Sequence, residues 1–386
     1  MNEPFADRVR RCQRGLADRG AGALIASPGP ALTYLTGVEE SPSERHFLAI
    51  VPRDGLPVVV APAMYRAELE AAPVDRIVLW DDGDDPVEAL TSAFEIVGLE
   101  PGTGTDETIL LDDRLWTTFA QDVRGLFPDA TYDLASQVLE PLRLRKDRTE
   151  RAALRRAGDL ADRVSTTLRE RGEEVVGLTE RDLADEIDRL LEAEGGRGPA
   201  FDTIVAAGEN GARPHHQPGD RSIEAGDPVV LDFGAFVDAD LESGQARYPG
   251  DQTRTLVFTS DPPEGYREVH ETVARAQRAA IEHVEPGVTA ESVDAVAREI
   301  ITDAGYGDAF VHRTGHGVGL EVHEPPYVVE GNDQALEPGM VFSVEPGIYL
   351  DSEFGVRLED LVVVTEDGCE RLNATPLGWA CESDRR

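Results

Sequence analysis

The pattern of apolar and polar positions over residues 1–140 alternates between short apolar runs and longer helix-like stretches. Runs rich in Val, Ile and Leu and bounded by turn residues predict buried strands. They are GALIAS, HFLAIV, PVVVAP, RIVLW and TILLDD. Asp54-Gly55 predicts a hairpin between the second and third of these runs, and segments such as VEALTSAFEIV predict helices between others. The alternation is typical of an α/β domain.

The chain changes character at about Pro141, where LRLRKDRTERAALRRAGDLADRVSTTLRERG predicts one long, heavily charged helix. We interpret this helix, over about residues 141–172, as the link into a second domain that spans residues 141–386. Further helices are predicted at GLTERDLADEIDRLLEAEGG, YREVHETVARAQRAAIEHV and residues 289–304. Thr179 and Asp182 have the spacing of a capping box at the start of the first of them. Strand-like runs such as PVVLDFGAFV and TRTLVF lie between the helices.

Composition adds a strong acidic bias to this picture. The chain has 75 Asp and Glu against 37 Lys and Arg, a net charge of −38, and its sole lysine is Lys146. Such a charge argues against nucleic acid as a partner. The acids are spread through every segment, which is typical of a salt-adapted (halophilic) protein, because salt screens the self-repulsion of a highly charged chain.

The compartment is predicted from three further features of the sequence. No apolar run approaches the roughly 18 residues that a membrane helix needs, and MNEPFADRVRRCQRG lacks the apolar core of a signal peptide. The three cysteines, Cys12, Cys369 and Cys381, lie far apart and form no CxxC pair. We therefore expect a cytoplasmic protein with free thiols and no membrane association.

Candidate chemistry is concentrated between residues 310 and 359, in FVHRTGHGVGLEVHEPP, MVFSVEPGIY and GVRLED. His316 stands between two glycines, and His323 follows seven residues later, a spacing that neither a helix nor a strand explains. Glu345 and Glu359 each end a short strand-like run. Alternation along the last run places Arg357 and Glu359 on one face, so Arg357 is expected to orient the Glu359 carboxylate.

Two aspartates complete the set of candidate ligands. Asp232 closes the apolar run VVL, and Asp251 opens DQTRTLVF. Taken singly, each of these acids has an ordinary explanation as a turn, cap or surface residue. Together with the residues above they make four carboxylates and one imidazole, namely Asp232, Asp251, His316, Glu345 and Glu359. Burial of such a set nearly requires bound cations, and it suits two divalent ions better than one.

In this order, these motifs resemble those of the pita-bread metallopeptidases, and most closely the Xaa-Pro peptidases (prolidases and aminopeptidases P). PALTYLTG and LRLRKDRTE resemble the family's N-terminal domain and linker, while LDFGAF, DQTRT, GHGVGLEVHEPP, VEPGIY and GVRLEDLVVVT resemble its catalytic domain. The resemblance implies a creatinase-like α/β N-terminal domain, an α+β pita-bread catalytic domain, and a homodimer.

The resemblance also implies roles for individual residues. Asp232, Asp251, His316, Glu345 and Glu359 would hold two divalent ions, with Asp251 and Glu359 bridging them. His215, in NGARPHHQP, and His323 would handle the substrate, Glu345 would transfer the proton, and Tyr349 and Arg357 would support the ligands. The implied reaction is hydrolysis of the bond before proline at the N-terminus of short peptides. An oxygen-rich site with one imidazole favours manganese, with cobalt, iron and zinc as alternatives.

The sequence departs from the family pattern at two places. Asp232 and Asp251 are nineteen residues apart, whereas the two aspartates of family members are about eleven apart. Closing a loop that is eight residues longer costs under about 1 kcal/mol, so the two strands can still pair. Asp240, within the longer connection, is a weaker alternative ligand. Many dipeptidases of the family carry an arginine after the HE motif to hold the dipeptide's carboxylate, and here Tyr327 follows HEPP. Unless Arg313 or Arg357 reaches that carboxylate, tripeptides should be cleaved at least as well as dipeptides.

Two other classes of function remain open at this point. A metal-free creatinase-like hydrolase can share this fold, although such proteins lack several of the ligands that this chain has. A catalytically inactive pita-bread binding module is the second alternative. Analysis of the metal content of the purified protein separates the metallopeptidase from both.

Overall fold

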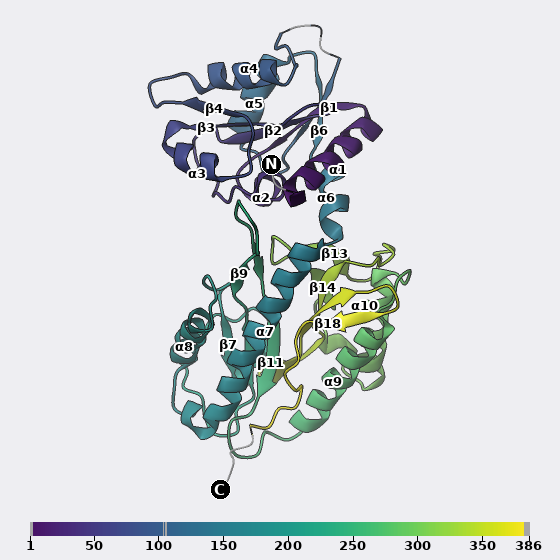
Figure 1. Ribbon diagram of the computed structural model, residues 1–386. Coiled ribbons are helices and arrows are strands. Elements are labelled where there is room, and N and C mark those ends of the chain that lie inside the picture. Colours follow the sequence, from purple (N-terminus) through teal and green to yellow (C-terminus); the bar gives the residue numbers. More distant parts are fainter. Residues whose placement is uncertain (1–2, 103, 105, 382–386) are drawn as a thin grey trace. The chain divides into compact units, whose positions relative to one another are not determined.

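The computed structural model describes residues 3–102, 104 and 106–381, and the chain divides into two compact units. The first unit comprises Met1–Arg143 together with Asp240–Ala246, and the second comprises Leu144–Ala239 and Arg247–Arg386 (Figure 1). The short segment in the first unit is the middle of the insertion between Asp232 and Asp251. Its Gln245 N–H donates a hydrogen bond to the Gly37 carbonyl at 2.7 Å. The added residues therefore pack with the first unit.

The first unit is built on a six-stranded mixed sheet with the order β4-β3-β2-β1-β5-β6. β1 pairs antiparallel with β2 and parallel with β5, and the β2–β3 hairpin predicted from Asp54-Gly55 is present. The strands are β1 (Ala21–Ala26), β2 (Leu48–Pro52), β3 (Val58–Pro62), β4 (Ile77–Trp80), β5 (Thr108–Leu111) and β6 (Thr131–Leu134).

Helices cover this sheet, as expected for an α/β domain. α4 and α5 bury apolar residues against Ile25 and Ile50 of the sheet, where Phe94 meets Phe127 edge-on with ring centroids 4.7 Å apart. α1 packs against β1 and β2 and buries Phe5 and Leu16. The helices are α1 (Glu3–Arg19), α2 (Pro30–Thr36), α3 (Arg66–Ala71), α4 (Pro86–Ile96), α5 (Thr117–Leu126) and α6 (Ser136–Leu144), with a 3-10 turn η1 (Ala63–Tyr65).

The linker differs from the single helix predicted over about 141–172. α6 ends at Leu144, and α7 (Arg148–Arg171) begins after a break at residues 145–147. Asp147 makes the break, because its side chain accepts the Glu150 N–H and forms a capping box that starts a new helix. Lys146 lies in this break, and its fully buried ammonium group donates a hydrogen bond to Glu324 Oε1 at 2.8 Å.

Among the described residues, no helix combines the length and the apolar character that crossing a membrane requires.

The second unit consists of two halves, each a pair of helices followed by antiparallel strands. α7 and α8 precede a three-stranded sheet with the order β11-β8-β7, and α9 and α10 precede a five-stranded sheet with the order β13-β12-β14-β17-β18. The predicted Thr179 cap and Asp182 capping box start α8. The remaining elements are η2 (Gly172–Val175), α8 (Glu180–Ala193), β7 (Ile204–Ala207), η3 (Gly208–Ala212), β8 (Val229–Phe233), β9 (Phe236–Asp238), β10 (Arg247–Pro249), β11 (Gln252–Leu256), α9 (Tyr266–His283), α10 (Ala290–Asp303), η4 (Gly307–Ala309), β12 (Gly315–Gly317), β13 (Glu324–Val328), β14 (Val341–Val344), β15 (Gly347–Leu350), β16 (Phe354–Arg357), β17 (Asp360–Val364) and β18 (Cys369–Arg371).

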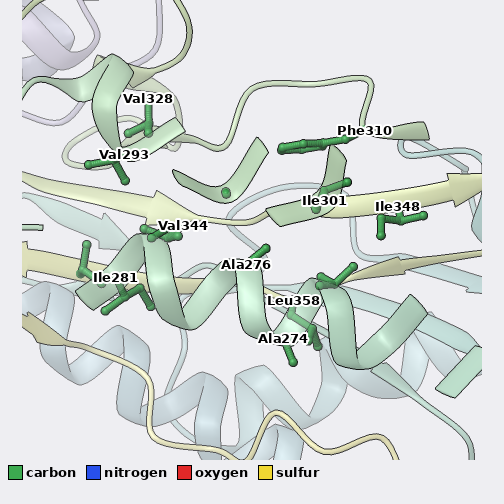
Figure 2. Packing of buried hydrophobic residues seen from close by; sticks show 14 of the residues in the cluster. Ala274, Ala276, Ile281, Val293, Ile301, Phe310, Val328, Val344, Ile348 and Leu358 are labelled. Carbon is green, nitrogen blue, oxygen red and sulfur yellow. The ribbon is translucent and has the colours of Figure 1, made fainter. Parts of the chain in front are cut away.

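A continuous apolar core holds the second of these halves together. Figure 2 shows Ala276 of α9 and Ile301 of α10 near Val344 of β14 and Ile348 of β15. Each fully buried aliphatic side chain of this kind contributes about 1.5–3 kcal/mol to folding. The core therefore fixes the strands next to Glu345 and Glu359.

Candidate metal centre

The two aspartates meet because β8 and β11 pair antiparallel. Asp232 lies opposite Thr253, and Phe233 lies opposite Gln252, so Asp251 stands just before the paired strand and next to the strand that carries Asp232. The insertion falls between β8 and β11, outside this pairing, and is taken up by the β9–β10 hairpin and its tip. The longer connection between the aspartates therefore leaves the register at the site unchanged.

His316 is held by close backbone packing in the middle of β12. A Cβ atom on Gly315 would lie 1.8 Å from the Ser343 carbonyl oxygen, and one on Gly317 would lie 2.3 Å from the Pro325 carbonyl oxygen. Only glycine fits at either position, which explains the GHG sequence. The Ser343 hydroxyl also accepts the His316 N–H at 3.0 Å, so the histidine backbone is fixed from β14.

The two glutamates approach from strand ends of the same half. Glu345 follows β14, and its Oε1 accepts the Ser343 hydroxyl at 3.2 Å. Glu359 lies between β16 and β17, and its N–H donates to the Thr253 carbonyl at 3.1 Å. Thr253 also donates its hydroxyl to Glu359 Oε2 at 2.7 Å. Glu359 is thereby joined through Thr253 to the strand that Asp251 precedes.

The side chains converge on a buried cluster. His316 Nε2 lies 3.3 Å from Glu345 Oε1 and 3.7 Å from Asp251 Oδ2. Ligand atoms of Asp251, His316 and Glu359 all lie within 4.8 Å of one another. In addition, Asp232 Oδ1 and Glu359 Oε1 are buried without a hydrogen-bond partner in the described chain. No donor in the described chain satisfies these two oxygens.

The protonation states match a cation site. Burial lowers the pKa of His316 to about 3, so its imidazole is neutral, and Nδ1 lies 3.2 Å from the Gly317 carbonyl, to which an Nδ1–H donates. Nε2 therefore carries a lone pair toward the carboxylates. Burial, and then the negative charge of neighbouring carboxylates, raises the pKa of Asp251 and of Glu359, and burial raises that of Glu345 to about 7. A bound cation would remove this repulsion, so the donor set fits a divalent metal.

Arg357 contacts a different carboxylate from the expected one. Its Nη2 donates to Asp232 Oδ2 at 2.6 Å, and its Nε donates to the Thr253 hydroxyl at 3.2 Å. The guanidinium reaches Glu359 only through that hydroxyl. Its Nη1 donates to the Tyr349 hydroxyl at 2.9 Å and to the Pro214 carbonyl at 3.2 Å. Arg357 and Tyr349 thus lie beside the cluster, as expected, and they hold Asp232.

A pocket of about 510 Å³ opens onto the cluster. His215 and His323 both line it and are both exposed, and the His323 ring lies 4.1 Å from the His316 ring, centroid to centroid. Asp240 is not among the residues that line the pocket. The complete lining is Phe201, Asp202, Ile204, Pro214, His215, Gln217, Asp232, Asp251, His312, Arg313, His316, Val322, His323, Glu345, Arg357 and Glu359.

Residues 152–366 match Metallopeptidase family M24, and residues 8–145 match the Creatinase/Prolidase N-terminal domain. A probable dipeptidase PepE of Mycobacterium tuberculosis is 40% identical over 97% of this chain and 96% of its own length. The chain belongs to metallopeptidase family M24. It is therefore a metal-dependent hydrolase.

Other M24 relatives extend the comparison to solved structures. An Xaa-Pro dipeptidase of Lactobacillus helveticus is 37% identical over 95% of this chain and 96% of its own length. The crystal structure of a prolidase from Thermococcus sibiricus superposes with a TM-score of 0.87 at 35% identity, covering 98% of this chain and all of that one. These matches confirm the predicted fold, an α/β creatinase-like domain followed by a pita-bread catalytic domain.

One pocket residue of this M24 chain was missed by the sequence analysis. His312 lines the pocket, its Nδ1–H donates to the Arg313 carbonyl at 2.7 Å, and its Nε2 lies 2.9 Å from the Tyr349 hydroxyl. Burial lowers its pKa to about 4, so the neutral ring accepts the tyrosine proton. His312 therefore orients Tyr349 toward Arg357. The signal was present in FVHRTGH, four residues before His316, but no spacing rule singles it out in a loop.

A second missed residue, Glu180, positions the loop that carries His215. Its fully buried carboxylate accepts the Ala207 N–H and the Asn210 amide, both at 2.8 Å, and the Gly219 N–H at 3.1 Å. It also lies 2.8 Å from His216 Nε2. Burial opposes the charge of Glu180, but these hydrogen bonds outweigh it and its pKa is lowered. Because His216 is engaged with Glu180, His215 is the member of the pair that lines the pocket.

Proposed function

We propose that the protein hydrolyses the peptide bond that precedes proline at the N-terminus of short peptides, using two divalent metal ions. The observation that carries this proposal is the buried convergence of Asp251, His316 and Glu359 beneath a pocket lined by His215 and His323. The relatives named as Xaa-Pro dipeptidases support the choice of peptide bond. Proline has no backbone N–H to donate. A site in which histidines hydrogen-bond to the carbonyl oxygen of the scissile bond does not need that N–H.

Each candidate residue has its own role in the proposed reaction. Asp232, Asp251, His316, Glu345 and Glu359 would hold the ions. When bound, divalent ions supply Lewis-acid chemistry that polarises a carbonyl and lowers the pKa of water. Glu345 accepts the proton of the attacking water and passes it to the leaving imide nitrogen. His215 and His323 donate hydrogen bonds to the carbonyl oxygen as negative charge develops on it.

The supporting residues keep this arrangement in place. Arg357 fixes Asp232 through the 2.6 Å contact, and Tyr349 with His312 fixes Arg357. Phe201, Ile204 and Val322 provide an apolar part of the pocket wall that suits a proline ring. We assign manganese as the metal, with cobalt, iron and zinc as alternatives, and we include a homodimer and a cytoplasmic location in the proposal.

The test combines metal analysis with a matched pair of peptides. We expect the purified, manganese-loaded protein to contain about two metal ions per chain and to cleave Ala-Pro-Ala far faster than Ala-Ala-Ala. A chelator should abolish cleavage, and manganese should restore it. Hydrolysis of creatine without metal would support the creatinase-like alternative. Bound metal without cleavage of either peptide would refute the proposed substrate, and peptide binding without metal or cleavage would favour the inactive module.

The acidic surface leads to a separate expectation about salt. With a net charge of −38 and one lysine, self-repulsion should loosen the folded chain at low ionic strength, and molar salt should screen it. We expect the melting temperature to rise by several degrees or more between low salt and molar KCl, which differential scanning calorimetry would measure. A melting temperature that does not change with salt would contradict salt adaptation.

A further inference from the structure

The sole lysine of the chain, Lys146, is enclosed by protein. The 37 basic residues are arginines with this one exception, and the Lys146 side chain is 0% exposed at the break between α6 and α7. An ammonium group is a compact point charge, whereas a guanidinium is a larger planar fork. In a chain that otherwise uses arginine, a fully buried lysine indicates a contact that requires the smaller group.

The ammonium group of Lys146 is bound by a residue at the start of β13. Its Nζ donates to Glu324 Oε1 at 2.8 Å, and the Glu324 side chain is only 4% exposed. The carboxylate fills the space beside Gly319, because a Cβ atom there would lie 2.2 Å from Oε1. The backbone of Glu324 pairs with Gly317 of β12. Glu324 therefore fixes both the base and the middle of the intervening loop, residues 318–323.

Both sides of this ion pair are also anchored to β14. The Lys146 N–H donates to the Gly339 carbonyl at 2.8 Å, just before that strand. The Val318 N–H donates to the carbonyl of Val341, the first residue of β14, at 3.0 Å. β14 in turn ends next to Glu345 of the cluster. The ion pair thus joins the linker to the 318–323 loop at a point where both are held to the same strand.

His323, the last residue of that loop, has no comparable restraint on its side chain. Its ring lines the pocket and packs against the His316 ring, but within the described chain no hydrogen bond or ion pair engages its nitrogens. The direction of the ring is therefore set by the backbone, and the next residue along the chain is Glu324. A buried ion pair contributes little net stability compared with apolar residues of the same volume. Its effect here lies in the geometry that it imposes on the loop.

We propose that Lys146 and Glu324 are positioning residues for the reaction, and that their ion pair holds the 318–323 loop so that His323 faces the carbonyl oxygen of the scissile bond. The inference rests on the proposed function, because the role of His323 is taken from there. Displacing a reacting group by about 1 Å can slow turnover on the order of a hundredfold. A residue of the linker, outside the pocket lining, thereby contributes to the rate.

The experiment is a double-mutant cycle between the ion pair and His323. Combining Lys146→Met with Glu324→Leu replaces both charges by apolar side chains, so neither charge is left buried alone. We expect kcat for Ala-Pro-Ala in excess manganese to fall about ten- to a hundredfold, while KM, metal content and melting temperature stay close to those of the unmodified protein. In the His323→Ala background, the same two substitutions should change kcat by less than about twofold, because the group through which they act is already absent.

Two further variants make the comparison specific. Arg145→Gln with Glu337→Gln is the matched control, because this pair joins the same break to the turn before β14 at 2.7 Å but is exposed on both sides. It should leave kcat unchanged. Gly319→Ala retains both charges and displaces the Glu324 carboxylate, so it should lower kcat by a factor similar to that of the double substitution, and again only when His323 is present.

The outcomes separate this inference from the proposed function. An equal loss of kcat in both backgrounds would give Lys146 and Glu324 a general structural role and overturn the inference. An unchanged kcat in the double substitution and in Gly319→Ala, beside a large loss in His323→Ala, would overturn it as well, and the peptidase assignment would stand in both cases. If the double substitution does not fold, Gly319→Ala carries the same cycle. If the unmodified protein does not cleave Ala-Pro-Ala, the proposed function fails and this inference fails with it.

Discussion

Replacing Asp251 or Glu345 by alanine is expected to abolish peptidase activity and to lower the amount of bound metal. Both carboxylates contact His316 within the cluster, at 3.7 and 3.3 Å, so each substitution removes a ligand from the proposed site. Glu345 would also be lost as the group that accepts the proton. The measurements are peptide hydrolysis in excess manganese and metal ions per chain after dialysis.

Two controls show whether the loss is specific. Without metal, the Asp251→Ala variant should have a melting temperature no lower than that of the unmodified protein. The pKa of the Asp251 carboxyl group is raised in the folded chain, so its negative charge destabilises the fold and removing it costs no stability. Asp240→Ala should keep both metal and activity, since Asp240 is exposed and lies outside the pocket lining. If Asp240→Ala lost both while Asp251→Ala kept them, the ligand assignment across the insertion would be wrong.

Substituting His323 by alanine should slow turnover without emptying the metal site. His323 is exposed, and no hydrogen bond or ion pair joins it to the carboxylates among the described residues. Its ring packs against the His316 ring, with the ring centroids 4.1 Å apart. Removal of one oxyanion donor in other hydrolases lowers kcat about 10²- to 10³-fold, and we expect a loss in that range. Steady-state kinetics on Ala-Pro and metal analysis of the same preparation measure both quantities.

His283→Ala provides the comparison for that variant. His283 lies on α9 and contacts the Ser292 hydroxyl at 3.1 Å, away from the pocket lining, so its removal should leave kcat unchanged. Loss of metal from His323→Ala would instead make His323 a ligand. A kcat close to that of the unmodified protein would exclude it from the stabilisation of the carbonyl oxygen.

Local sequence patterns were sufficient for most of the helices and strands and for the places of the candidate ligands along them. The runs that end at Asp232, Glu345 and Glu359 are strands or strand ends, because β-branched residues and alternation are local signals. The pairing of Asp232 with the Thr253 strand could also be anticipated, since an insertion in a hairpin tip does not alter the register of the strands below it. Candidate ligands could thus be chosen one strand at a time.

Contacts between distant segments could not be predicted in this way. Arg357 was assigned to Glu359, two residues away, but it binds Asp232, 125 residues away. Alternation says which face a side chain occupies, but not which neighbour on that face it meets. His312 and Glu180 were missed for the same reason, because their roles appear only when Tyr349 and the His215 loop are placed beside them.

The buried ion pair between Lys146 and Glu324 has a practical consequence for chemical labelling. Lys146 is the sole lysine, and its side chain is 0% exposed while it donates to Glu324. Reagents that acylate amines should therefore leave Lys146 untouched while the chain is folded. Acylation of Lys146 would occur only after the break between α6 and α7 had opened, so that this one amine would record unfolding of the linker.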